Sequence, residues 1–224
     1  VVITAMLALG LSAAPAFAVT PDDSAITIGN SNCDLSSAFV GAGTSADPYL
    51  IGTEKELAEL NDCIGGDYLY VVLTADIDLT PSSDSSKPWN DTGNGGWTPI
   101  GNSNTSFQGQ VYGNHHTISN LTINRTDNYQ GLFGDTYTAR IKNLTITGSV
   151  TVPSDYDYIG ALVGNADYLT ATDIHTDVDI STESDYVGGV VGYLDIGVLT
   201  DLVVDGDLTG TYYGSTARYW GGIA

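Results

Sequence analysis

The sequence has few basic residues. Only six of its 224 residues are Lys or Arg, against 27 Asp and Glu, which gives a formal net charge of −21. A surface of this sign repels nucleic-acid phosphates and anionic lipid head groups, so we expect no nucleic acid among the partners. The simplest role of the charge is to keep the chain soluble.

Glutamate is also scarce, since only four of the acidic residues are Glu and the others are Asp. Asp bonds its own backbone in tight turns, so the composition favours strands and turns over helices. One segment does predict a helix. Thr53 and Glu56 have the spacing of a capping box, and Leu57, Leu60 and Ile64 share one face. We expect this helix to cover the open end of a stacked β-structure.

Charged residues are absent from residues 1–18. Residues 3–11 are apolar, and Ala16-Phe17-Ala18 fits the small-x-small rule of signal peptidase. We interpret this segment as an incomplete signal peptide, which predicts a secreted or bacterial cell-surface protein. The mature chain, starting near Val19, is expected to contain no membrane span.

Only two cysteines occur, Cys33 and Cys63. In an oxidising compartment we expect them to form a disulfide, which would stabilise the chain by ~3–4 kcal/mol in the chain-entropy model. Two thiols are too few ligands for a zinc site.

The motifs of common hydrolases are also missing. The sequence contains no His-Glu-x-x-His zinc motif and no Gly-x-Ser-x-Gly nucleophile elbow. Its three histidines are His115, His116 and His175, and adjacent residues of a strand point to opposite faces. We therefore predict no catalytic residues, no metal site and no cofactor.

Repetition is what the sequence has in abundance. The hexapeptide Ile-Lys-Asn-Leu-Thr-Ile at 141–146 closely matches residues 118–123 and, less closely, residues 199–204. A second element, a tyrosine followed by a Gly-flanked apolar run, recurs at intervals of 29, 28 and 33 residues. Its tyrosines are Tyr129, Tyr158, Tyr186 and Tyr219. Self-similarity at this period predicts a stacked-repeat architecture.

Each unit contains three short strands and no helix, which predicts an all-β, single-stranded parallel β-helix with a short N-terminal capping helix. Strands of successive coils would pair at ~4.8 Å. Aligning the motifs predicts that Ile141, Leu144 and Ile146 lie over Ile118, Leu121 and Ile123. It also predicts one polar column, which either bonds neighbouring turns or is simply exposed: Asn120, Asn143, Asp173 and Asp201.

The chain divides into five segments. Residues 1–18 are the signal segment, 19–47 an extended lead-in, 48–80 the cap helix and first strands, 81–96 a long surface loop, and 97–224 the repeats. Because the last repeat stops inside a unit, we expect the natural chain to continue beyond Ala224.

Weak binding candidates lie in or beside the long loop, namely Trp89, Asp91 and Trp97. Indole rings stack on sugars, and the oxygens of Asp84, Asn90, Asp91 and Asn94 are of the type that binds calcium. Their spacing matches no calcium motif, so we favour simple loop solvation. The repeated tyrosines are expected to form an aromatic row, in which packing is favoured over recognition.

The Gly-flanked runs at 131–134, 160–164 and 188–192, with the elements at 47–51, 73–79 and 97–101, resemble bacterial surface proteins that carry GLUG-type repeats. The resemblance covers roughly residues 40–224. It implies a right-handed parallel β-helix similar to the pectin-lyase-like class, in secreted or wall-attached proteins. Some such proteins join the repeats to zinc metallopeptidases that cleave immunoglobulin A. His115 departs from the usual Gly, and Asp173 and Asp201 from the usual Asn.

These observations predict a non-catalytic surface stalk or adhesion module that binds a host or cell-surface glycan or protein. One alternative is a carbohydrate-active enzyme, either a polysaccharide lyase or a glycosidase. A cleft that clusters carboxylates with Arg125, Arg140 or Lys142 would favour it. A second alternative is an accessory repeat region of a larger surface peptidase.

Overall fold

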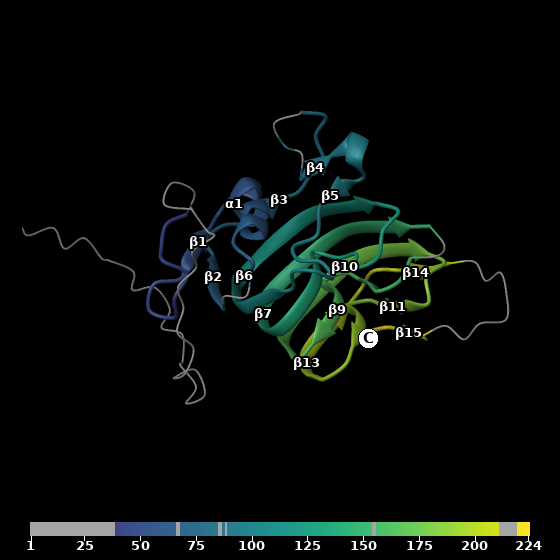
Figure 1. Ribbon diagram of the computed structural model, residues 1–224. Coiled ribbons are helices and arrows are strands. Elements are labelled where there is room, and N and C mark those ends of the chain that lie inside the picture. Colours follow the sequence, from purple (N-terminus) through teal and green to yellow (C-terminus); the bar gives the residue numbers. More distant parts are fainter. Residues whose placement is uncertain (1–38, 66–67, 85–86, 88, 154–155, 211–218) are drawn as a thin grey trace, which may run out of the picture.

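The computed structural model describes residues 39–65, 68–84, 87, 89–153, 156–210 and 219–224. Within these ranges the chain forms a parallel β-solenoid of about four turns, as the sequence predicted. One sheet of 12 strands and a second of three strands wind around a common interior. In Figure 1 the coils lie side by side from the helix α1 to the C-terminal strands.

The elements have the following bounds. The helices are α1 (Glu54–Glu59), η2 (Leu60–Asp62) and η3 (Thr92–Asn94). The strands are β1 (Tyr49–Ile51), β2 (Leu69–Leu73), β3 (Ile77–Asp78), β4 (Asn90–Asp91), β5 (Gly96–Trp97), β6 (Phe107–Asn124), β7 (Phe133–Val152), β8 (Ile159–Gly160), β9 (Val163–Asp167), β10 (Leu169–Thr182), β11 (Tyr186–Gly188), β12 (Val191–Leu194), β13 (Gly197–Val204), β14 (Leu208–Thr209) and β15 (Tyr219–Gly221).

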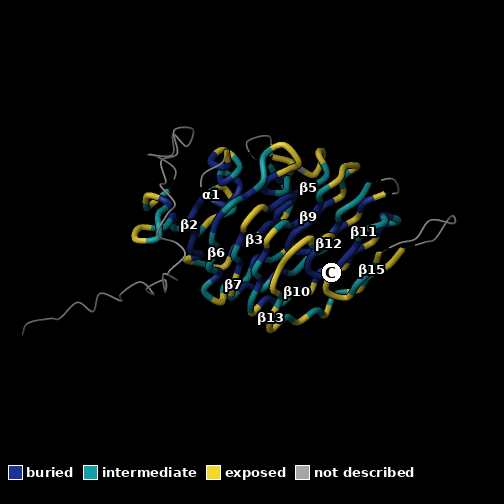
Figure 2. Tube along the Cα trace, turned by 60° about the horizontal axis from the view of Figure 1, so that its bottom comes forward, coloured by how far each residue is buried: buried dark blue, intermediate teal, exposed yellow. Residues whose placement is uncertain are grey.

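The interior is a continuous apolar column, drawn dark blue in Figure 2. Because side chains alternate along each strand, every second residue points inwards. The ring centroids of Phe107 and Phe133 lie 5.0 Å apart in this column. Ile118 and Ile146 stack on successive coils, and both are buried.

The register of the first two coils corrects the alignment of the hexapeptides. Ile118 pairs with Ile146 and not with Ile141, and Leu121 pairs with Gly148 and not with Leu144. The predicted stacking of residues 118–123 under 141–146 is therefore wrong. The later copies stack as predicted, because Leu144 pairs with Ile174 and Ile174 pairs with Leu202.

The hexapeptide encodes a local turn and not a position around the coil. Asn120 and Asn143 both adopt the left-handed conformation, with φ of 59° and 57°, which Asn tolerates better than most residues. A strand that bends at such a corner therefore occurs on two sides of the coil, once at Asn120 and once at Asn143. Register shifts in β6, between Tyr112 and His116 and again after Ile118, accommodate extra residues of the first coil.

Gly148 shows why this register needs a glycine. Its φ is 148°, and a Cβ atom placed on it would lie 2.0 Å from the carbonyl oxygen of Leu121. A side chain at this position would collide with the backbone of the preceding coil, so only glycine permits the close approach.

Asn143, Asp173 and Asp201 stack in one column, with φ between 53° and 57°. Asn120 lies outside this column, at another corner, where its amide donates to Asp78 Oδ1 at 2.9 Å. His115 has a φ of 61°. This histidine thus adopts a conformation that is more typical of glycine.

The N-terminal helix begins where the sequence predicted. Thr53 Oγ1 accepts from the Glu56 backbone N–H at 3.2 Å, and Glu56 Oε2 accepts from the Gly52 N–H at 2.8 Å. Leu57 and Leu60 are buried against the first coil. Among the described residues α1 is the single α-helix, and it lies at the N-terminal side of the solenoid (Figure 1).

Two predictions concern residues outside the described ranges, namely the signal segment 1–18 and Cys33. Cys63 is buried directly after η2, and its disulfide with Cys33 stays a prediction. In the part of the chain that the structure describes, no helix has the length and apolar character needed to cross a membrane.

Candidate binding cavity

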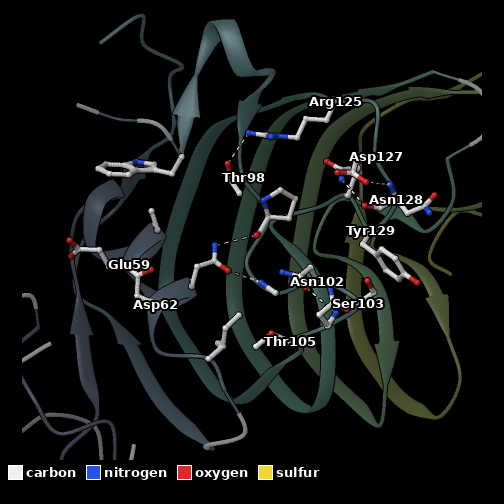
Figure 3. Close-up of a pocket in the computed structure, with 18 residues that line it drawn as sticks. Glu59, Asp62, Thr98, Asn102, Ser103, Thr105, Arg125, Asp127, Asn128 and Tyr129 are labelled. Atoms are coloured by element: carbon white, nitrogen blue, oxygen red, sulfur yellow. Dashed lines mark hydrogen bonds between the residues drawn. The ribbon is translucent and has the colours of Figure 1, made fainter. Parts of the chain in front are cut away.

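A cavity of about 990 Å³ lies where the N-terminal helix meets the solenoid (Figure 3). We call it the cap cavity. Its walls are α1 and η2, the loop 98–105, the segment 125–130 and Trp89. In Figure 3, Glu59 and Asp62 lie on the helix side, and Asp127, Asn128 and Tyr129 lie opposite.

Asn61 joins the helix to the loop. Its Nδ2 donates to the Pro99 carbonyl at 3.2 Å, and its Oδ1 accepts from the Gly101 N–H at 2.9 Å. The loop then closes on itself, because Asn102 and Thr105 exchange two backbone hydrogen bonds of 2.9 and 3.0 Å. Two walls of the cavity are therefore fixed relative to each other.

Arg125 holds the third wall. Its Nε donates to the Trp97 carbonyl, and its Nη2 donates to the Gly96 carbonyl and to Thr98 Oγ1, each at 2.8 Å. Burial lowers the pKa of the Arg125 guanidinium, and the nearby Asp127 carboxylate acts in the opposite direction. The guanidinium thus secures the backbone of β5 beside the cavity.

The segment after Arg125 is tied to the next coil. Asn128 Oδ1 accepts from the Asp157 N–H at 2.7 Å, and Gln130 Nε2 donates to the Asn128 carbonyl at 2.8 Å. Asp157 repeats the role of Asn128 one coil further on, since its Oδ1 accepts from the Asp185 N–H at 2.9 Å. A polar side chain thus bonds successive coils at this corner.

The tyrosine row predicted from the sequence is present and starts at the cavity. Adjacent rings of Tyr129, Tyr158, Tyr186 and Tyr219 are stacked, with centroid separations of 5.1, 5.2 and 5.0 Å. Tyr193 packs edge-on against two of them, Tyr158 and Tyr186. Burial, followed by the neighbouring Tyr129 and Tyr186, raises the pKa of Tyr158. We call these four rings the tyrosine stack.

Three polar atoms of the lining are buried without a hydrogen-bond partner. They are Glu59 Oε2, Trp89 Nε1 and Gln130 Oε1. Glu59 does form an ion pair with Lys55, but through its other oxygen. Most buried polar atoms in proteins are paired, either with protein groups or with ordered water, so these three atoms are free to bond water or another molecule that enters the cavity.

The three loop candidates differ in position. Trp89 lines the cavity. Trp97 is fully buried, and its Nε1 donates to the Leu132 carbonyl at 3.1 Å, so its indole belongs to the core. Asp91 lies in β4. Asn90, one of the oxygen-bearing residues considered for calcium, instead donates to Glu54 Oε1 and to the Leu79 carbonyl at 2.8 Å each.

Each histidine lies beside a different aspartate. His115 lies 3.6 Å from Asp173, His116 lies 3.1 Å from Asp76, and His175 lies 2.8 Å from Asp205. Within the described ranges no group of three or more His, Cys, Asp and Glu side chains is placed to hold a metal ion.

The cavity does cluster carboxylates with one basic residue. Glu59, Asp62, Asp127 and Arg125 line it together, which is the arrangement that would favour an enzyme. Lys142 lies elsewhere, with its Nζ 4.9 Å from the centroid of the Tyr112 ring. Nothing in the sequence distinguishes the amides Asn61, Asn102 and Asn128, because asparagine is common in any turn.

No protein-family model matches the chain. Over 134 residues it is 40% identical to a protein of Evansella cellulosilytica named "Putative Gly-rich membrane protein", which covers 58% of the chain and 15% of that protein. Over 166 residues it is 34% identical to "Halomucin" of Haloquadratum walsbyi, which covers 71% of the chain and 2% of that protein. The chain thus spans a small part of these relatives.

A solved structure of a "putative immunoglobulin A1 protease" from Bacteroides ovatus can be superposed with a TM-score of 0.40 at 17% identity. The superposition covers 76% of this chain and 69% of the other.

Proposed function

We propose that the chain is a non-catalytic module of an extracellular surface protein, in which the solenoid is a rigid support and the cap cavity is the binding site. The names of the two sequence relatives, a membrane protein and a halomucin, support a place at the cell surface. The observation that carries the binding role is the cavity itself, whose polar lining is fixed by hydrogen bonds but retains unpaired buried atoms.

Membership of the GLUG-repeat surface proteins is part of this proposal. The Gly-flanked runs that suggested it occupy one side of the solenoid in successive coils. Gly160 pairs with Gly188, and Gln130 forms a bridge with Ile159. The motif thus has a structural role, because its glycines bring the backbones of neighbouring coils close together.

A fluorescent antibody raised against the chain tests the location. We expect it to label intact producing cells, and we expect brief protease treatment of those cells to remove the label. Labelling that requires permeabilised cells would contradict a surface role.

A carbohydrate-active enzyme is the second candidate, because the cavity combines three carboxylates with Arg125. The non-catalytic proposal predicts that the purified chain releases no reducing ends or unsaturated products from neutral or acidic polysaccharides. Product formation that Asp127→Asn abolishes would establish the enzyme instead.

A further inference from the structure

The unpaired atoms of the cap cavity indicate the chemistry of its ligand. Gln130 is 3% exposed, and its Oε1 is a buried acceptor, as is Glu59 Oε2. Trp89 Nε1 is a buried donor. A ligand that satisfies all three atoms must both donate and accept hydrogen bonds.

We propose that the cap cavity binds a neutral oligosaccharide, with sugar rings packed against Trp89 and Tyr129. A sugar hydroxyl donates one hydrogen bond and accepts others, which matches this mixture of unpaired atoms. The cavity, at about 990 Å³, is at the upper end of the usual volume of ligand sites. The inference rests on the binding role proposed above and specifies its ligand.

The charges of the lining disfavour acidic glycans. Glu59, Asp62 and Asp127 contribute three carboxylates, and the net charge of the chain is −21. An acidic sugar would be repelled, and the Nε and Nη2 atoms of Arg125 already donate to protein acceptors. A cationic sugar would be attracted by the same carboxylates, so chitosan oligomers are the stringent comparison for a neutral ligand.

Tyr129 is the end of the tyrosine stack that faces the cavity. Tyr158 covers one of its faces at a centroid separation of 5.1 Å, and Tyr129 lines the cavity whereas Tyr158 does not. A sugar ring on the opposite face would add one layer to the stack. Because the stack already fixes the orientation of this ring, little side-chain entropy would be lost on binding.

An array of gluco-, manno- and galacto-oligosaccharides, with oligogalacturonate and chitosan oligomers as charged comparisons, tests the proposal on the whole chain. We expect signal on neutral oligosaccharides, followed by titration calorimetry with the strongest of them. Trp89→Ala and Tyr129→Ala should each weaken that binding by at least about 10-fold. Tyr129→Phe should retain it, because the stacking face is unchanged.

Tyr186→Ala is the matched control. It interrupts the same stack two coils from the cavity, so it should lower thermal stability without changing the affinity. Neutral-glycan binding that is unaffected by both Trp89→Ala and Tyr129→Ala would overturn the proposal. So would array signal confined to charged glycans, or no signal at all.

Failure of this inference can be distinguished from failure of the proposed function. Surface labelling of intact cells without glycan binding refutes the ligand and leaves the surface role standing. Binding accompanied by cleavage refutes the non-catalytic role and leaves the glycan site standing.

Discussion

Tyr158 is the most informative residue of the tyrosine stack to substitute. Its ring packs on Tyr129 and Tyr186 at 5.1 and 5.2 Å, and edge-on against Tyr193 at 5.7 Å. Each aromatic pair contributes about 0.5–1.5 kcal/mol beyond the area that it buries. The three pairs together would contribute about 1.5–4.5 kcal/mol. Because the ring is only half-buried, we take the lower part of this range and expect Tyr158→Ala to reduce the free energy of unfolding by about 2–3 kcal/mol.

The backbone at this position adds a second expectation. Tyr158 has a φ of 70°, and the left-handed conformation costs roughly 1–2 kcal/mol for a residue with a side chain. Glycine avoids that cost but loses about 0.5–1 kcal/mol of conformational freedom relative to alanine. Tyr158→Gly should therefore be no less stable than Tyr158→Ala, whereas a glycine inside a strand is usually less stable than an alanine.

Urea unfolding followed by far-UV circular dichroism measures both effects. Tyr158→Phe, which keeps all three ring contacts, is the control and should differ from the natural chain by less than about 0.5 kcal/mol. A Tyr158→Ala variant as stable as the Phe variant would show that the stack contributes nothing. A Gly variant well below the Ala variant would contradict the argument from φ.

Three further predictions test the fold. Phe107 is fully buried, so Phe107→Ala should lower the free energy of unfolding by about 3–5 kcal/mol in the same urea assay. Gly148→Ala should cost more than about 2 kcal/mol because its Cβ would lie 2.0 Å from a carbonyl oxygen, whereas Gly222→Ala, with nothing within 4 Å, should be nearly neutral. Hydrogen bonds, first that from Asn120, lower the pKa of Asp78 below 3.8. The carboxylate therefore stabilises the fold above pH 3.8, and this contribution is lost as the pH falls through the folded-state pKa. The melting-temperature difference between the natural chain and Asp78→Asn should shrink in that range, and a constant difference would contradict the assignment.

The sequence predicted the parallel solenoid because repetition is a property of the whole chain. Four tyrosines at a nearly constant interval align correctly without coordinates, since stacked coils place equivalent residues above one another. The helix was predictable from Thr53 and Glu56, because a capping box is a local signal.

The register of the first coils was not predictable from the hexapeptides. Asn120 and Asn143 adopt the same left-handed corner on different sides of the coil, so nearly identical local sequences have different neighbours. Gly148, which lies over Leu121, was the residue that distinguished the two alignments. Gly148 matters because of its contact with the preceding coil, and comparing the repeats within the sequence does not reveal that contact.

Sequence alone does not predict the cap cavity. Trp89 was a candidate because an indole ring can stack on a sugar, and in the structure it lines the cavity. Trp97 was indistinguishable from it in the sequence but is buried in the core. The cavity also depends on residues far apart in the chain, such as Asn61 and Gln130, whose proximity follows from the way the helix docks on the coils.

Cysteine cross-linking of exterior positions tests the coil register most directly. In the structure Thr122 pairs with Ser149, and paired parallel strands lie ~4.8 Å apart. The alignment of the hexapeptides would instead place Thr122 over Thr145, which is four residues from Ser149 and hence about 13 Å away along an extended strand. With a short bifunctional thiol reagent, we predict that Thr122→Cys with Ser149→Cys cross-links efficiently. Efficient cross-linking of Thr122→Cys with Thr145→Cys, and not of the first pair, would contradict the structure.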